Sequence, residues 1–90
     1  MPKYIIEREI PDSGKLSQAE LKDISQKSNG VLSGIGNGIQ WQHSYVTDNK
    51  IYCVYIAPDK GLVTEHAKKC EIPANSINEI VTIIDPATAE

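Results

Sequence analysis

The residues best suited to chemistry in this chain are its two histidines, His43 and His66. Tyr45 lies close to the first in the sequence, and Cys70 follows the second. Imidazole nitrogen, thiol sulfur and phenol oxygen together suit a borderline divalent metal such as nickel, copper or zinc. We therefore take His43, His66, Tyr45 and Cys70 as candidate metal ligands.

Each candidate also has a structural interpretation. A histidine among strand aromatics is more often a hydrogen-bonded core residue, and a tyrosine such as Tyr45 usually packs with its hydroxyl at the rim. Cys70 lies near the predicted end of a helix and lacks the electropositive setting that activates thiolates. The sequence contains no short-spaced metal-binding pair, no Ser-His-Asp pattern and no paired catalytic carboxylates. A metal site therefore depends on the fold bringing His43 and His66 together.

The composition limits the classes of protein to consider. Ninety residues with a net charge of −3 make one domain, and no basic run is present that could neutralise several phosphates. Nucleic acid is therefore not an expected partner. No apolar run approaches the roughly 20 residues that span a bilayer, so we expect a cytoplasmic protein. Two cysteines do not form a secreted disulfide framework, and both are expected to be reduced.

The first half of the chain predicts a strand followed by a helix. Residues 3–10 have the composition of a strand and lead into the turn sequence Pro-Asp-Ser-Gly. A capping box from Ser17 to Glu20 starts an amphipathic helix, and the glycines from Gly34 to Gly38 end it. This glycine run follows a helix and precedes a strand, the reverse of the order in a phosphate-binding loop. We therefore interpret it as a helix stop and a loop.

The second half predicts a hairpin, a helix and a strand. Residues 39–57 form two runs rich in aromatic and β-branched residues, joined by a polar turn at Asp48. Asp59 is the expected N-cap of a second helix, which Pro73 ends. Residues 76–84 supply the last strand.

The order β-α-β-β-α-β is the split βαβ pattern of ferredoxin-like domains. We expect a single α+β domain over residues 1–90, with a four-stranded antiparallel sheet and two helices on one face. The strand at residues 51–56 is apolar on both faces, whereas burial of one face alone would produce alternation. We therefore expect a homodimer through the uncovered sheet face, because small domains rarely leave large apolar patches in water.

The hairpin turn decides which side chains share a face. With an even number of loop residues, Tyr45 lies opposite Tyr52 and His43 lies opposite Val54. One face then carries Trp41, His43, Tyr45, Tyr52, Val54 and Ile56. The other carries Gln40, Gln42, Ser44, Val46, Ile51, Cys53 and Tyr55. Because the first set is more aromatic, we assign it to the helix side, where His43 would meet His66, and the second set to a partner subunit.

Several stretches carry a family resemblance. They are Pro2-Lys3-Tyr4 with Glu7-Arg8, residues 38–41 and 44–58 of the hairpin, Glu65-His66-Ala67, Pro73-Ala74-Asn75 and residues 82–86. Together they resemble a family of small bacterial proteins catalogued as a domain of unknown function, one branch of which is named nickel-binding protein. The resemblance runs the length of the chain. It implies a dimeric ferredoxin-like α/β fold and, for some relatives, divalent-metal binding.

Three functional hypotheses follow. The first is a cytoplasmic homodimer that holds a divalent transition metal, most plausibly nickel, through His43 and His66 with help from Tyr45 or Cys70. The second is a monooxygenase-like dimer whose helix–sheet cleft binds a small molecule, with His43 or Tyr45 as acid or base. Glu7, Arg8 and Glu9 are expected to form a solvated or ion-paired edge, although Arg8 would hold an anionic ligand if its side chain faced such a cleft. The third is an interaction module whose dimer is its main role.

Overall fold

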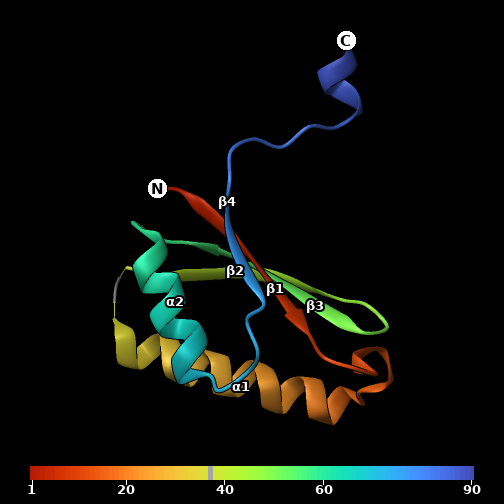
Figure 1. Ribbon diagram of the computed structural model, residues 1–90, viewed down its shortest axis with the longest axis vertical. Coiled ribbons are helices and arrows are strands. Elements are labelled where there is room, and N and C mark those ends of the chain that lie inside the picture. The colour runs from red at the N-terminus through yellow and green to blue at the C-terminus, as the bar shows by residue number, and fades with distance from the viewer. Residues whose placement is uncertain (37) are drawn as a thin grey trace.

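The computed structural model of the protein describes residues 1–36 and 38–90. Its main elements are β1 (Lys3–Glu9), α1 (Gln18–Ile35), β2 (Gln40–Val46), β3 (Lys50–Ile56), α2 (Lys60–Lys69) and β4 (Ser76–Ile80), with short 3-10 helices η1 (Ser13–Lys15) and η2 (Pro86–Ala89). The strands form one antiparallel sheet in the order β2-β3-β1-β4. Both helices cover the same face of this sheet (Figure 1). The predicted α+β class and ferredoxin-like element order are confirmed. Within the described ranges no helix is long and apolar enough to cross a membrane.

Both helices begin where the sequence predicts. Ser17 Oγ accepts a hydrogen bond from the Glu20 amide, and Glu20 Oε1 accepts one from the Ser17 amide, each at 3.1 Å. Asp59 Oδ1 accepts from the Leu62 amide at 2.9 Å. These side chains satisfy amides that have no partner inside the helix.

Removing the first cap is expected to cost about 1 kcal/mol of the free energy of unfolding. Ser17→Ala deletes the acceptor for the Glu20 amide while leaving the core untouched. Ser33→Ala is the matched control, because Ser33 lies exposed in the same helix. Urea denaturation of both variants measures the effect. A loss from Ser17→Ala no larger than that from Ser33→Ala would contradict the capping assignment.

The glycine run ends α1 as predicted, although Gly34 itself lies inside the last turn. Gly36 is the C-cap, and its backbone φ of 99° is a conformation that side chains other than glycine rarely adopt. Asn37, the next residue of this loop, lies outside the described residues.

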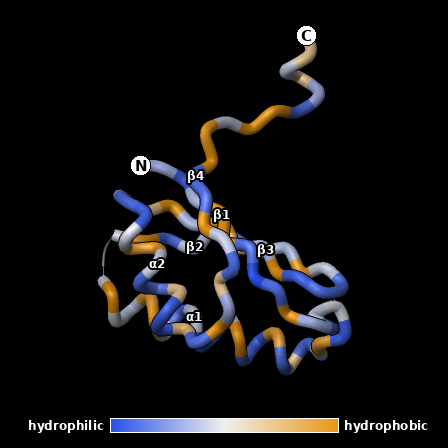
Figure 2. The backbone as a smooth tube through the Cα atoms, in the orientation of Figure 1, coloured by the Kyte–Doolittle hydropathy of each residue, from blue (hydrophilic) through white to orange (hydrophobic). Residues whose placement is uncertain are grey.

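The last strand is shorter than predicted. β4 ends at Ile80, which is paired with Lys3 at the beginning of β1. Because β1 extends no further, residues 81–84 have no ladder on which to continue, and this mostly hydrophobic segment leaves the body of the domain (Figures 1 and 2). Val81, Ile83 and Ile84 are 89%, 65% and 76% exposed.

The core lies between the sheet and the two helices. In β1 the inward side chains are Tyr4 and Ile6, whose ladder partners in β3 are Tyr55 and Cys53. Side chains from α2 and β3 complete the buried cluster, including Val63, Ala67 and Ile51. Among residues 1–36 and 38–90, no helix lies over the opposite face of the sheet (Figure 1).

The hairpin pairs as predicted, with Tyr45 opposite Tyr52 and His43 opposite Val54. The assignment of its faces was wrong. Cys53 is buried on the helix side beside Ile6, so its sequence neighbours point away from the helices. The open face therefore carries His43, Tyr45, Tyr52, Val54 and Ile56, and the helix side carries Ser44, Val46, Ile51, Cys53 and Tyr55. Aromatic content was a poor criterion, because histidine and tyrosine carry polar groups that tolerate water.

Trp41 lies on the helix side, as predicted, but for a different reason. A β-bulge between Trp41 and His43 places an extra residue, Gln42, in β2. The bulge shifts the alternation by one position, so Trp41 lies on the opposite face from His43. The Trp41 indole Nε1 donates to Ser44 Oγ at 3.0 Å.

Candidate functional site

The four candidate metal ligands form two separate pairs. His43 and Tyr45 lie on the open face of β2, with 3.1 Å between His43 Nε2 and the Tyr45 hydroxyl. Their rings meet edge to face, with centroids 5.0 Å apart. His66 and Cys70 are buried on the helix side. The sheet lies between the two pairs, so the prediction that His43 and His66 line one cleft is wrong.

His66 is the centre of a buried polar cluster built from both helices and β3. Its side chain is fully buried, and its Nε2 lies 3.0 Å from the Tyr55 hydroxyl and 3.4 Å from Ser28 Oγ. Cys70 Sγ lies 3.6 Å from the same nitrogen. The Tyr55 hydroxyl can donate to Nε2 when the imidazole proton is on Nδ1, and it can accept from Nε2 in the other tautomer.

Burial keeps this cluster uncharged. It lowers the pKa of His66 to about 4, and the nearby Arg8 charge adds to this effect. It also raises the pKa of Tyr55 to about 12, chiefly by desolvation of the phenolate. Burial raises the pKa of the Cys70 thiol as well. At neutral pH these three groups are therefore all neutral.

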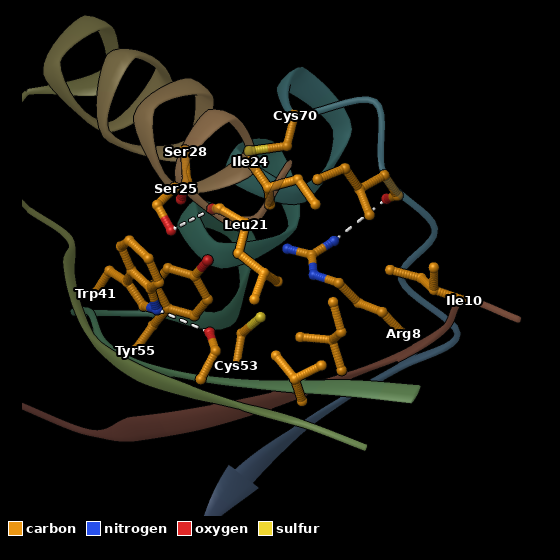
Figure 3. Close-up of a pocket in the computed structure, with 14 residues that line it drawn as sticks. Arg8, Ile10, Leu21, Ile24, Ser25, Ser28, Trp41, Cys53, Tyr55 and Cys70 are labelled. Carbon is orange, nitrogen blue, oxygen red and sulfur yellow. Dashed lines mark hydrogen bonds between the residues drawn. The ribbon is translucent and has the colours of Figure 1, made fainter. Parts of the chain in front are cut away.

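A cavity of about 70 Å³ lies beside the cluster, between α1 and the helix side of the sheet (Figure 3). Arg8, Cys53, Tyr55 and Cys70 are its buried polar and sulfur-bearing side chains. The rest of its lining consists of Ile10, Leu21, Ile24, Ser25, Ser28, Trp41, Ser44, Val46, Ile51 and Ile72. Its surface is mostly apolar, and its clearest chemical feature is the Arg8 guanidinium.

Arg8 is 3% exposed, and its Nη1 donates to the backbone carbonyls of Ile72 and Pro73, both at 3.2 Å. Burial lowers the pKa of this guanidinium, but the Cys53 thiol and the Tyr55 phenol raise it by more, so the group stays charged. In the described part of the chain no carboxylate lies within ion-pairing distance of it. The expectation that Arg8 belongs to a solvated or ion-paired edge is therefore wrong, and its side chain instead lines the cavity.

The two pairs differ in how well they fit a metal cation. No group of three or more His, Cys, Asp or Glu side chains gathers for a metal among residues 1–36 and 38–90. At His66 and Cys70 a metal would lie near the buried Arg8 charge, which opposes a second cation. At His43 and Tyr45 the imidazole and hydroxyl are exposed side by side. The open-face pair is the better match to a divalent metal.

The fold and these groups define a small ferredoxin-like α/β domain with an exposed imidazole–phenol pair on its open face and a cavity beside a buried arginine on its helix-covered face. The family model described as "Nickel responsive protein SCO4226-like" matches residues 4–80, and the chain belongs to this family. The resemblance inferred from the sequence is thereby confirmed.

A solved structure has the same fold. The crystal structure of SCO4226 from Streptomyces coelicolor A3(2) matches with a TM-score of 0.76 and 13% sequence identity. The match covers 91% of this chain and 99% of that chain. At this identity the likeness shows the fold alone. No curated protein matches the chain.

Proposed function

We propose that the protein binds nickel as a homodimer, with the metal held on the open face of the sheet by His43 and Tyr45. The carrying observation is the 3.1 Å separation of His43 Nε2 and the Tyr45 hydroxyl, on exposed side chains of one strand. Membership of a nickel-responsive family supports nickel as the metal.

The chemistry of this donor pair suits the ion. Neutral imidazole is a common ligand for nickel and its neighbours in the first transition row. Two donor atoms about 3 Å apart can occupy adjacent positions around one metal, given metal–ligand bonds near 2 Å. The pair also lies on the solvent side of β2, so a hydrated ion can reach it without opening the core.

The proposed homodimer is supported by the apolar side chains on the open face of the sheet. Ile5, Tyr52 and Ile56 lie there half-buried around the buried Val54, and in the described part of the chain no helix covers them. Covering this apolar surface with a second copy would remove it from water. In a two-fold dimer every interface residue occurs twice, so the interface would carry two imidazoles rather than one. That would supply ligands that a single chain lacks.

Calorimetric titration with nickel chloride tests the site. Wild-type protein is expected to bind with a dissociation constant on the order of micromolar, with one nickel for each pair of chains. His43→Ala should weaken binding by more than the roughly 10- to 100-fold that follows loss of an outer-shell partner. Tyr45→Phe should weaken it less, and Tyr52→Phe, its cross-strand neighbour, is the matched control.

Two results would overturn the proposal. Nickel affinity unchanged by His43→Ala would exclude the open-face pair, and loss of affinity in Cys70→Ala would move the metal to the buried cluster. Sedimentation showing only monomer at micromolar concentration, with and without nickel, would exclude the dimer.

A further inference from the structure

We propose that the cavity beside Arg8 binds a short-chain monocarboxylate, with the guanidinium holding the carboxylate and the apolar walls holding the alkyl chain. This site lies on the helix side of the sheet and is independent of the proposed nickel site. It is supported by an uncompensated buried charge, a matching cavity and a route to solvent.

The charge of Arg8 has no protein counterion in the described ranges. Its neighbours Glu7 and Glu9 alternate to the opposite face of β1, where Glu7 Oε1 lies 3.4 Å from Lys50 Nζ. The recorded hydrogen bonds of Arg8 go to two backbone carbonyls. Burying a cation without an anion is unfavourable, so an anion entering from solvent would relieve that cost.

The groups nearest to the guanidinium do not supply the missing charge. The pKa of Tyr55 is raised to about 12, and burial also raises the pKa of the Cys70 thiol, so both remain protonated at neutral pH. His66, with its pKa near 4, is neutral. Tyr55, Cys70 and His66 therefore supply no negative charge to pair with the guanidinium.

The geometry of Arg8 leaves donors for such a ligand. Its Nη1 is directed to the loop at Ile72, whereas the other terminal nitrogen points toward Leu21 across the cavity (Figure 3). A guanidinium can donate two parallel hydrogen bonds to one carboxylate. The remaining nitrogens are thus suited to a carboxylate head group.

The size and lining of the cavity define the rest of the ligand. Its volume of about 70 Å³ is about half that of a cavity of roughly 150 Å³ that binds benzene, which suits a ligand of only a few heavy atoms such as acetate or propionate. Beyond Arg8 the walls are formed largely by aliphatic side chains: Ile10, Leu21, Ile24, Val46, Ile51 and Ile72. A phosphate or sulfate would leave several oxygens against these apolar walls, whereas an alkyl chain packs there.

The cavity reaches the protein surface between α1 and β2. Its lining includes the half-buried Leu21 and Ser25 of α1 and the half-buried Trp41 and Ser44 of β2. Val46, at the end of β2, is 43% exposed. A small ligand can therefore enter between α1 and β2 without separating the helices from the sheet.

The sequence provides two unambiguous reporters. Arg8 is the only arginine and Trp41 the only tryptophan, so the Arg8 Nε–H and the Trp41 indole N–H each give one signal in a nitrogen-15 NMR spectrum. Titration of the full chain with sodium propionate at constant ionic strength should shift both signals in a saturable way, with a dissociation constant on the order of 1 mM. Propionamide, the uncharged analogue, should produce no saturable shift of the Arg8 signal.

Two charge-removing variants separate this site from general surface effects. Arg8→Met should weaken propionate binding at least about tenfold, followed at Trp41. Lys22→Met removes an exposed cation from α1 and should bind like the wild type. If Arg8→Met fails to give a folded spectrum, Arg8→Lys replaces it and should also bind more weakly, because an ammonium cannot form the two parallel bonds.

Several outcomes would overturn this site. They are the absence of saturable shifts, equal binding of propionate and propionamide, and tighter binding of phosphate than of propionate. Unchanged affinity in the folded Arg8 variant, or an equal loss in Lys22→Met, would do the same.

Discussion

Lowering the pH from 7 to 4 is expected to reduce the free energy of unfolding by about 3 kcal/mol through His66 alone. Histidine in the unfolded chain titrates near pH 6.5, whereas burial lowers the pKa of His66 to about 4. Between these values the unfolded state binds a proton that the folded state does not, so stability falls as the pH falls. Each pH unit in that interval contributes about 1.36 kcal/mol. Above pH 6.5 both states are neutral at this site and the effect vanishes.

Urea denaturation at intervals from pH 7 to 4 measures this loss. His66→Gln removes the titration while keeping a polar side chain near Tyr55 and Ser28, and should flatten the pH dependence in that interval. His43→Gln is the matched control, because it removes the other histidine without touching the buried cluster. Carboxylates also titrate at the acidic end, so the decisive quantity is the difference between the two variants. Equal pH dependence in both would contradict the assignment of the loss to His66.

Local patterns in the sequence were enough to predict the order of the strands and helices. Ser17 with Glu20 and Asp59 with its following helix are caps whose geometry depends only on nearby residues. The hairpin register also followed from the short turn at Asp48. These features require no knowledge of which face of the sheet the helices cover.

These local patterns do not indicate which face of the sheet the two helices cover. β3 buries side chains on both of its faces, since Val54 on the open face is 7% exposed and Cys53 on the helix side is 6% exposed. Its pattern therefore fits either orientation. The error carried directly into the site, because the proposed meeting of His43 and His66 assumed the wrong side. The β-bulge at Gln42 was not predicted either, because we recognised no sequence pattern that indicates it.

Arg8 was more accessible to sequence reasoning. Arg8 lies on the same face of β1 as Tyr4 and Ile6, because every second side chain of a strand points the same way. The two apolar residues favour burial of that face. The intervening Glu7 and Glu9 favour the opposite side. Giving more weight to β1 than to the aromatic content of the hairpin would have indicated both the helix-covered face and an arginine pointing into it.

Ile6→Ala is expected to destabilise the protein by about 2–5 kcal/mol, the range for truncating a fully buried aliphatic side chain. Ile6 is 0% exposed and lies in the ladder between Cys53 and Ile77 under the helices. Ile5→Ala makes the same change one residue away, on the open and half-buried face. In the monomer it should cost clearly less, because the open face packs against no helix. Urea denaturation of both variants at low protein concentration measures this contrast.

The same pair of variants also tests what covers the open face. If a second copy packs there, Ile5→Ala should weaken dimerisation, so a higher protein concentration should be needed before its melting temperature begins to rise with concentration than in the wild type. The effect of Ile6→Ala should appear equally in monomer and dimer, because its surroundings are internal to one chain. A larger loss from Ile5→Ala than from Ile6→Ala at concentrations where the chain is monomeric would reverse the sides of the sheet. Such a result would remove the inward placement of Arg8, and with it the structural basis of the carboxylate site.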